Sequence, residues 1–194
     1  MLKCVRIIAG EFRSRTLKAP PGMATRPTSD RLRETLFNVL APRIEGSAFL
    51  DLYAGSGAVG IEALSRGAAN VALVERAAPA LKVLRANLER LGLTAQVGVH
   101  AVAVSNYLKQ PAARPAFDIV FLDPPYDAEN EYASTLGLLG GSSRGLLKPG
   151  ATVIAEHRRQ DQLPESVGTL MRTRTLRQGD ATLSFYAIAE EQSS

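Results

Sequence analysis

Residues 49–60 read Phe-Leu-Asp-Leu-Tyr-Ala-Gly-Ser-Gly-Ala-Val-Gly, an apolar run followed by glycines at positions 55, 57 and 60. These glycines are spaced G-x-G-x-x-G and stand between a predicted strand over 48–53 and a predicted helix over 58–66. In this context glycines let the backbone approach a ligand closely and let the helix begin tight against the strand. The stretch therefore predicts a ligand-binding turn at the carboxyl end of a strand in an open α/β sheet.

Strand-like and helix-like segments alternate after this turn. Further strands are expected over 70–75, 96–101, 117–123 and 151–156, a second helix over 78–91, and two tail strands over 169–176 and 181–189. Gly179-Asp180 between the tail strands is a hairpin signal. Repeated strand–helix units joined by short loops require a parallel sheet with helices on both faces. We therefore predict an α/β, Rossmann-like fold with a mostly parallel sheet, to which the closing hairpin adds one antiparallel strand.

Two carboxylates distinguish between possible ligands of the glycine turn. Asp51 stands four positions before the first glycine, at the carboxyl end of its strand. A carboxylate there would repel an anionic dinucleotide pyrophosphate, but it suits S-adenosylmethionine, which has no phosphate and carries a cationic amino group. Glu75 ends the next strand, where a carboxylate can accept both hydroxyls of a ribose. The pair favours S-adenosylmethionine; a glycine turn without a ligand is the alternative.

The tetrad Asp123-Pro124-Pro125-Tyr126 ends the fourth predicted strand and lies at the same sheet edge as the glycine turn. Asp123 and the Pro124 carbonyl can each accept one N–H of an exocyclic amine on a nucleobase, which aims the nitrogen lone pair at a methyl donor. Two prolines stiffen this backbone, and Tyr126 offers a face on which a base can stack. A turn that only ends a strand is the alternative interpretation.

Positive charge is concentrated in the first 45 residues. They carry a net charge of +5, whereas residues 46–194 carry −1. Such asymmetry is typical of an arm that binds a polyanion, most often a nucleic acid; a basic face exposed only to water is the alternative. We therefore divide the chain into a basic N-terminal extension, residues 1–45, and a main domain, residues 46–194.

This extension has two predicted parts. The β-prone runs over 5–9 and 15–18 predict a hairpin that ends at Pro20-Pro21-Gly22. A helix follows, capped by Thr28 or Ser29 and ended by Pro42. Its charged residues Arg31, Arg33 and Glu34 are expected on its polar side.

These motifs together resemble a known family. The run FLDLYAGSGAVGIEALSRGA over 49–68, the acid Glu75 and FLDPPY over 121–126 are similar to motifs of S-adenosylmethionine-dependent methyltransferases that act on amino groups. The runs RIIAGEFRSRTLKAP over 6–20 and TRPTSDRLRETLFNVL over 25–40 narrow the resemblance. From about residue 5 to residue 188, the chain resembles the bacterial 16S ribosomal RNA (guanine(966)-N(2))-methyltransferase family.

This resemblance implies direct SN2 transfer of a methyl group from S-adenosylmethionine to the N2 amine of a guanine in 16S rRNA, within the small ribosomal subunit. It implies no metal and no covalent enzyme intermediate. The catalytic residues would be Asp123, Pro124, Pro125 and Tyr126. The cofactor would be bound by Asp51, Tyr53, Ala54, Gly55, Ser56, Gly57, Glu75, Arg76, Ala103 and Thr28. The RNA would be bound by Arg6, Arg13, Arg15, Lys18, Arg26 and Arg31.

In one place the chain departs from that family. Many relatives carry Asp or Asn after the third strand of the sheet, where the side chain meets the adenine of the cofactor. Here the sequence is His100-Ala101-Val102-Ala103. We therefore expect backbone groups near Val102 and Ala103 to recognise the adenine.

Composition excludes several other classes of protein. The single Cys4 cannot form a disulfide framework, and two histidines are too few for a His-rich metal centre. The sequence has no apolar run long enough to span a membrane and no signal peptide, so we expect a cytoplasmic protein. His157 follows the strand over 151–156, and we expect it in a solvated polar loop.

Several alternative functions remain open from the residues alone. The tetrad also suits a DNA methyltransferase acting on adenine N6 or cytosine N4, although the chain has no room for a large target-recognition domain. A methyltransferase acting on a protein glutamine is a second alternative, but its tetrad usually begins with Asn. A non-catalytic RNA-binding assembly factor is a third, and an NAD-dependent oxidoreductase, disfavoured by Asp51, is a fourth.

Overall fold

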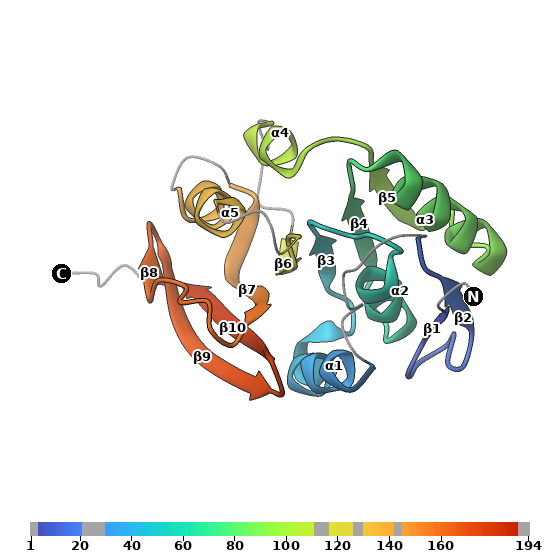
Figure 1. Ribbon diagram of the computed structural model, residues 1–194, viewed down its shortest axis with the longest axis horizontal. Helices are drawn as coiled ribbons and strands as arrows, with labels where there is room; N and C mark the ends of the chain where they lie inside the picture. The colour runs from blue at the N-terminus through green and yellow to red at the C-terminus, as the bar shows by residue number, and fades with distance from the viewer. Residues whose placement is uncertain (1–3, 21–29, 111–116, 126–129, 142–144, 190–194) are drawn as a thin grey trace.

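The computed structural model describes residues 4–20, 30–110, 117–125, 130–141 and 145–189. A large β-sheet runs through the molecule with helices on both faces, and a small two-stranded sheet lies beside it (Figure 1). The strands of the large sheet follow the order β5-β4-β3-β6-β7-β10-β9-β8. In that order, their bounds are Val97–His100, Asn70–Val74, Ala48–Asp51, Phe117–Leu122, Leu147–Arg158, Ala181–Ile188, Leu170–Gln178 and Ser166–Val167.

The predicted mostly parallel sheet is confirmed. Strands β5, β4, β3, β6 and β7 all pair in parallel, as expected for strands joined by helices. Beyond β7 the pairing becomes antiparallel through β10, β9 and β8. The prediction of one added antiparallel strand was therefore too low, because both tail strands and the short β8 join the same sheet. Strand β7 is also longer than expected, since Lys148-Pro149-Gly150 lies within it rather than before it.

Helices cover both faces of the sheet (Figure 1). Their bounds are Asp30–Ile44 for α1, Ala58–Ser65 for α2, Ala78–Leu91 for α3, Val104–Lys109 for α4 and Glu131–Gly140 for α5. Helices α1, α2 and α3 pack on one face of the sheet, and α4 and α5 pack on the other. Each face has its own hydrophobic cluster. Helix α3 has the bounds expected from the sequence. None of the helices in the described part of the chain has the length and hydropathy of a membrane span.

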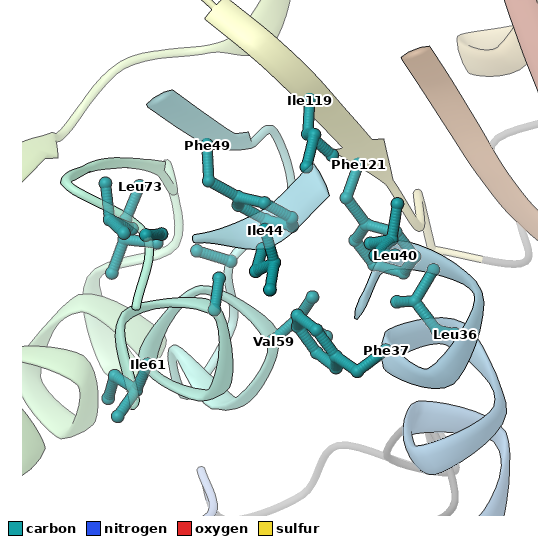
Figure 2. Packing of buried hydrophobic residues seen from close by; sticks show 14 of the residues in the cluster. Leu36, Phe37, Leu40, Ile44, Phe49, Val59, Ile61, Leu73, Ile119 and Phe121 are labelled. Carbon is teal, nitrogen blue, oxygen red and sulfur yellow. The ribbon is translucent and has the colours of Figure 1, made fainter. Parts of the chain in front are cut away.

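The core between α1, α2 and the central strands is dense (Figure 2). Phe37 of α1 stacks against Phe49 of β3, with ring centroids 6.2 Å apart. Leu36 and Leu40 of α1 lie with Phe121 of β6 in the same cluster. Burial of each such side chain stabilises the fold by about 1.5 to 3 kcal/mol relative to exposure. This packing holds α1 and α2 against β3 and β6.

Two expectations for α1 were wrong. Pro42 does not end the helix, which continues to Ile44. The Ile44 side chain is buried. Arg43 donates hydrogen bonds to the Thr152 hydroxyl, at 2.8 Å, and to the Gly150 carbonyl, and these contacts hold the last turn in place. Arg33 does not lie on an exposed polar side, since it is only 1% exposed. Its guanidinium donates to the Arg6 carbonyl, so a buried charge connects α1 to the N-terminal hairpin.

The predicted N-terminal hairpin is present in shorter form. Strand β1, Cys4–Arg6, pairs antiparallel with β2, Thr16–Lys18. Val5, Ile7 and Leu17 are buried in the cluster that α1 and α2 share with the sheet. The division of the chain after residue 45 stays a prediction.

Candidate active site

The glycine turn between β3 and α2 has the conformation that its sequence requires. Gly57 is the N-cap of α2 with φ of 82°, and a Cβ there would lie 2.5 Å from Leu84 Cδ1. A Cβ at Gly60 would lie 2.2 Å from Leu73 Cδ2, so this glycine lets α2 pack closely on β4. At Gly55, φ is 54° and a Cβ would meet no atom within 4 Å. The turn therefore leaves open space on the side of Gly55.

Asp51 lies at the carboxyl end of β3 beneath this turn. Its side chain is 2% exposed, and Oδ2 accepts a 3.2 Å hydrogen bond from the Gly60 N–H. The other oxygen, Oδ1, has no partner with hydrogen-bonding geometry among the described residues. Burial raises the pKa of Asp51 to about 7, and the Glu75 and Glu156 carboxylates act in the same direction. A buried carboxylate with an unsatisfied oxygen is a place where a cationic group would be stabilised.

Glu75 joins the glycine turn to the segment that leads into α3. It follows β4, and its Oε2 accepts from the Gly55 N–H at 3.0 Å while Oε1 accepts from the Ala77 N–H at 2.7 Å. Each carboxylate oxygen has a second lone pair, so Glu75 can still accept hydroxyl donors at this edge. Arg76, beside it, is exposed.

Tyr53 connects the glycine turn to α5 on the opposite face. Its hydroxyl donates to Glu131 Oε2 at 2.8 Å and lies 2.7 Å from Thr135 Oγ1. Burial is the main cause that raises the pKa of Tyr53 above its usual value. The predicted position Ala103 lies at the same edge, as the residue before α4, where the rings of His100 and Tyr107 pack 4.8 Å apart.

The Asp-Pro-Pro segment follows β6 at this edge. Asp123 is half-buried, Pro124 is buried and Pro125 is exposed. Burial raises the pKa of Asp123 well above its usual value, with further contributions from the nearby Glu156 and Asp51 carboxylates. Asp123 is therefore held where its charge is poorly solvated, as expected for a group that meets donors from a ligand.

Three carboxylates lie close together on three neighbouring strands: Asp51 ends β3, Asp123 directly follows β6 and Glu156 lies within β7. Leu122 pairs with Ala155 in the parallel register, so Asp123 and Glu156 are the next residues along adjacent strands. We call these three residues the carboxylate row. Like charges in a buried site repel each other strongly unless cations or donors compensate them.

The carboxylate row lies on the face that α1 and α2 cover. Side chains two residues apart on a strand share a face. Asp51 follows Phe49 by two residues and Glu156 follows Ile154 by two, and both apolar residues belong to the cluster beneath α1 and α2. Glu156 was not selected from the sequence. The signal was its place at the end of a predicted strand, the position that Asp51 and Asp123 also occupy.

His157, next to Glu156, was expected in a solvated loop, and this expectation was wrong. It lies within β7 and is 5% exposed. Its Nε2 is 2.8 Å from Ser184 Oγ, and its Nδ1 is 2.9 Å from the Arg158 carbonyl oxygen. Strand β7 extends past Glu156 because β10 pairs with it as far as Arg158. His157 is therefore part of the sheet.

The N-terminal hairpin is fixed to α2 through a buried carboxylate. Glu62 is fully buried and accepts from the backbone N–H groups of Ile8, at 2.8 Å, and Ala9, at 3.0 Å. Arg66 donates to Glu62 at 2.7 Å, and Arg33 Nε lies 3.7 Å from it. We call this the Glu62 anchor, and it was not expected from the sequence.

A second connection brings the hairpin to the glycine turn. Asn87 of α3 is buried, and its side chain accepts from the Lys18 N–H at 2.9 Å and donates to the Lys18 carbonyl at 3.0 Å. Its amide also donates to the Ser56 carbonyl at 3.0 Å. The end of β2 is therefore joined to the glycine turn, and no local pattern in the sequence indicated this connection.

Most of the predicted RNA-binding side chains are on the surface. Arg6, Arg13, Arg15 and Lys18 are exposed on the hairpin, and Arg31 is exposed on α1. Arg26, Thr28 and Tyr126 lie outside the described residues. In the described part of the chain, no group of three His, Cys, Asp or Glu residues could hold a metal ion.

Comparison with known proteins places the chain in a family. A family model described as Conserved hypothetical protein 95 matches residues 5–187. The chain belongs to this family. The ribosomal RNA small subunit methyltransferase D of Haemophilus influenzae is 41% identical over 174 residues, which cover 88% of each chain. The protein of the same name from Escherichia coli K12 is 40% identical over 161 residues, covering 82% of this chain and 78% of the relative.

Solved structures agree with the fold. The Escherichia coli protein yhhF superposes with a TM-score of 0.84 at 33% identity, covering 97% of this chain and all of that one. An RNA methyltransferase from Salinibacter ruber, solved with S-adenosyl-L-homocysteine, has a TM-score of 0.61 at 18% identity, and covers 85% of this chain and 95% of its own. The predicted family and the class I methyltransferase fold are confirmed. The relatives named above are rRNA methyltransferases, as the predicted activity requires.

Proposed function

We propose that the protein methylates the N2 amine of one guanine in 16S rRNA, as part of the assembling or assembled small ribosomal subunit in the cytoplasm. The observation that carries the proposal is the position of Asp123 and Pro124 at the end of β6, beside the glycine turn and Asp51. One oxygen of Asp51 has no hydrogen-bond partner among the residues that the structure describes. An amine-binding segment and a cation-binding carboxylate then face one space at the same sheet edge. The names of the relatives support 16S rRNA as the substrate.

The residues at this edge fit S-adenosylmethionine. Asp51 Oδ1 is buried without a partner among the described residues, which suits the cationic amino group. The open space at Gly55 leaves room for the ligand beside the turn, and Glu75 has lone pairs available for ribose hydroxyls. We assign the remaining cofactor-binding positions to the lining of this site: Tyr53, Ala54, Ser56, Gly57, Arg76, Ala103 and Thr28. When bound, the cofactor supplies a methyl group on a sulfonium, which an amine nitrogen can displace directly.

Asp123 and Pro124 would position the target amine. A guanine N2 amine is a poor nucleophile because its lone pair is delocalised into the ring. If the Asp123 carboxylate and the Pro124 carbonyl each accept one N–H, the lone pair is directed away from both acceptors. The new N–C bond forms as the C–S bond breaks, and one amine proton then leaves by way of Asp123 to water. The raised pKa of Asp123 makes this carboxylate a better proton acceptor than an exposed one.

The hairpin would bind the phosphates around the target. Arg6, Arg13 and Arg15 are exposed on a hairpin that the Glu62 anchor and Asn87 fix beside the glycine turn. A rigid basic hairpin at that place can orient an RNA segment whose target base has left its stack. We propose the same role for Lys18, Arg26 and Arg31, and we propose residues 1–45 as the RNA-binding extension of a methyltransferase domain formed by residues 46–194.

Transfer of labelled methyl from S-adenosylmethionine tests this function. Small ribosomal subunits that lack the modification are incubated with the protein, and the product nucleosides are separated and mapped. N2-methylguanosine at a single position of 16S rRNA is the expected result. Label on DNA, or on free RNA only, would overturn the proposed substrate. Binding of the cofactor with no transfer to any nucleic acid would instead indicate an RNA-binding assembly factor.

A further inference from the structure

The Tyr53 hydroxyl joins the glycine turn to the first turn of α5. It donates to Glu131 Oε2 at 2.8 Å and lies 2.7 Å from Thr135 Oγ1. A phenol has a single proton, and Glu131 receives it, so the Thr135 hydroxyl is the donor in the second hydrogen bond. Thr135 is buried and Tyr53 is half-buried, so water competes little for the bond between them. The proton of the Tyr53 hydroxyl is therefore committed to α5 and is not available to a ligand.

The first turn of α5 has a second connection on the other side of β6. Tyr132, next to Glu131, donates from its hydroxyl to the backbone carbonyl of Glu156 on β7 at 2.7 Å. In the sheet, β6 lies between β3 and β7. Tyr53 follows β3 and Asp123 follows β6, so the two hydrogen bonds of α5 lie on either side of Asp123. The first turn of α5 is therefore fixed across the end of β6.

The segment that would hold the target amine is joined to this turn. Leu122, directly before Asp123, is buried in the same hydrophobic cluster as Tyr132. The connection that begins with Asp123 and Pro124 ends at α5. A shift of α5 would therefore move both ends of the connection that carries the two amine acceptors.

Direct displacement requires the amine nitrogen, the methyl carbon and the sulfur to lie in line, and a misplacement of about 1 Å can lower the rate by about a hundredfold. The glycine turn and the segment after β6 are separate parts of the chain, and the Tyr53 hydroxyl connects them through α5. Resting on the proposed function, we propose that Tyr53 is a positioning residue that fixes the target amine relative to the cofactor by means of Glu131 and Thr135. Its hydroxyl acts on the rate of transfer and not on the affinity for either ligand.

The variant Tyr53→Phe removes the hydroxyl and keeps the ring. In single-turnover transfer of labelled methyl to small ribosomal subunits, with S-adenosylmethionine at saturation, the rate should fall by about tenfold or more. The dissociation constants of S-adenosylmethionine, by calorimetry, and of the subunit, by filter binding, should each stay within about twofold of the wild type. The matched control is Tyr186→Phe on β10, which loses a 2.8 Å hydrogen bond to the Pro164 carbonyl and should transfer methyl at the wild-type rate.

Substitutions of the exposed Glu131 separate the hydrogen bond from other effects. Glu131→Ala removes the acceptor and should slow the transfer several-fold. Glu131→Gln keeps a side-chain oxygen that can accept from the Tyr53 hydroxyl, so its rate should stay close to that of the wild type. When Glu131→Ala is combined with Tyr53→Phe, no further loss is expected, because both changes remove the same hydrogen bond.

Three results would overturn the role of Tyr53. The first is a rate in Tyr53→Phe equal to that in Tyr186→Phe. The second is a double variant in which the two losses multiply. The third is weaker binding of S-adenosylmethionine with an unchanged rate at saturation, since the hydroxyl would then serve cofactor binding. If the wild type transfers no methyl group to guanine in 16S rRNA, the proposed function fails instead, so the two failures are distinguishable.

Discussion

Two buried carboxylate sites in this molecule are opposite in character. At the Glu62 anchor, one fully buried acid meets Arg66, Arg33 and two backbone N–H groups. In the carboxylate row, Asp51 is 2% exposed, has one oxygen without a partner among the described residues, and has a pKa raised to about 7. Glu62 and Asp51 are both almost completely buried, so burial alone does not separate the two sites.

The difference between the two sites lies in compensation. A buried charge whose donors come from the protein stabilises the arrangement of those donors, here the hairpin against α2. A buried charge whose donors are incomplete is destabilising until a ligand completes them. Under this account, substitutions at the anchor should change stability, and substitutions in the row should change binding and catalysis.

The largest effect is expected at Asp123. Asp123→Ala removes an acceptor of the amine and should lower the rate of methyl transfer by about a thousandfold or more, in the range seen when one aligned polar group is lost from an active site. Affinity for S-adenosylmethionine, measured by calorimetry, should change only a few-fold. The matched control is Asp118→Asn on the same strand, where the acid pairs with the partly exposed Lys148 at 2.7 Å. A large loss of cofactor binding in Asp123→Ala would indicate a packing role instead.

The second effect is a loss of stability at the anchor. Glu62→Gln leaves Arg33 and Arg66 without their buried counter-charge and should lower the free energy of unfolding by about 3 to 5 kcal/mol. Denaturant titration measures this change, with the exposed helical variant Glu89→Gln expected within about 0.5 kcal/mol of the wild type. If Glu62→Gln were as stable as Glu89→Gln, the anchor would not hold the hairpin.

The third effect concerns pH and Asp51. Because the pKa of Asp51 is about 7 in the folded protein and about 4 when unfolded, the folded state binds the proton more tightly. Its contribution to stability is full below about pH 4 and is lost as the pH rises toward 7. Without cofactor, the stability of Asp51→Asn should exceed that of the wild type at pH 8 by more than at pH 5. If the free energy of unfolding changed with pH in the same way in both proteins, Asp51 would not be a buried carboxylate with a raised pKa.

The smallest effect is expected on the hairpin surface. Arg13 and Arg15 are exposed, and changing both to Gln should weaken RNA binding several-fold without changing affinity for the cofactor. The dependence of binding on salt should also decrease, by roughly one in the log–log slope for each phosphate contact removed. An unchanged slope in filter-binding titrations from low to moderate salt would show that these arginines face water and contact no phosphate.

The local patterns of the sequence predict much of this fold. Helix α3 has its expected bounds because Pro79 stands near its start and Gly92 adopts φ of 73° at its end. Helix α4 was not predicted because it has only six residues, and α5 was not predicted because Gly137 and Gly140 weaken its helical pattern. The end of α1 was placed too early because Pro42 is a local signal, whereas Arg43 is held by contacts with residues more than a hundred positions away.

The residues of the candidate site could be predicted where they belong to sequence motifs. They could not be predicted where only tertiary contacts bring them together. Asp51, Glu75 and Asp123 end strands beside recognisable turns, and the structure brings all three to one sheet edge. Arg33 appeared to be a surface residue because its partner, Glu62, is 29 positions away. The position of Glu156 next to Asp123 follows only from the pairing of β7 with β6.

Calorimetric titration of S-adenosylmethionine into the wild type, Asp51→Asn and Glu62→Gln, below their unfolding temperatures, tests the contrast between the two sites most directly. We expect Asp51→Asn to weaken binding by about tenfold or more, because the cationic amino group loses its buried counter-charge. Glu62→Gln should bind like the wild type. Equal binding by the wild type and Asp51→Asn, with weakened binding by Glu62→Gln, would contradict the assignment of the carboxylate row to the ligand and of Glu62 to the fold.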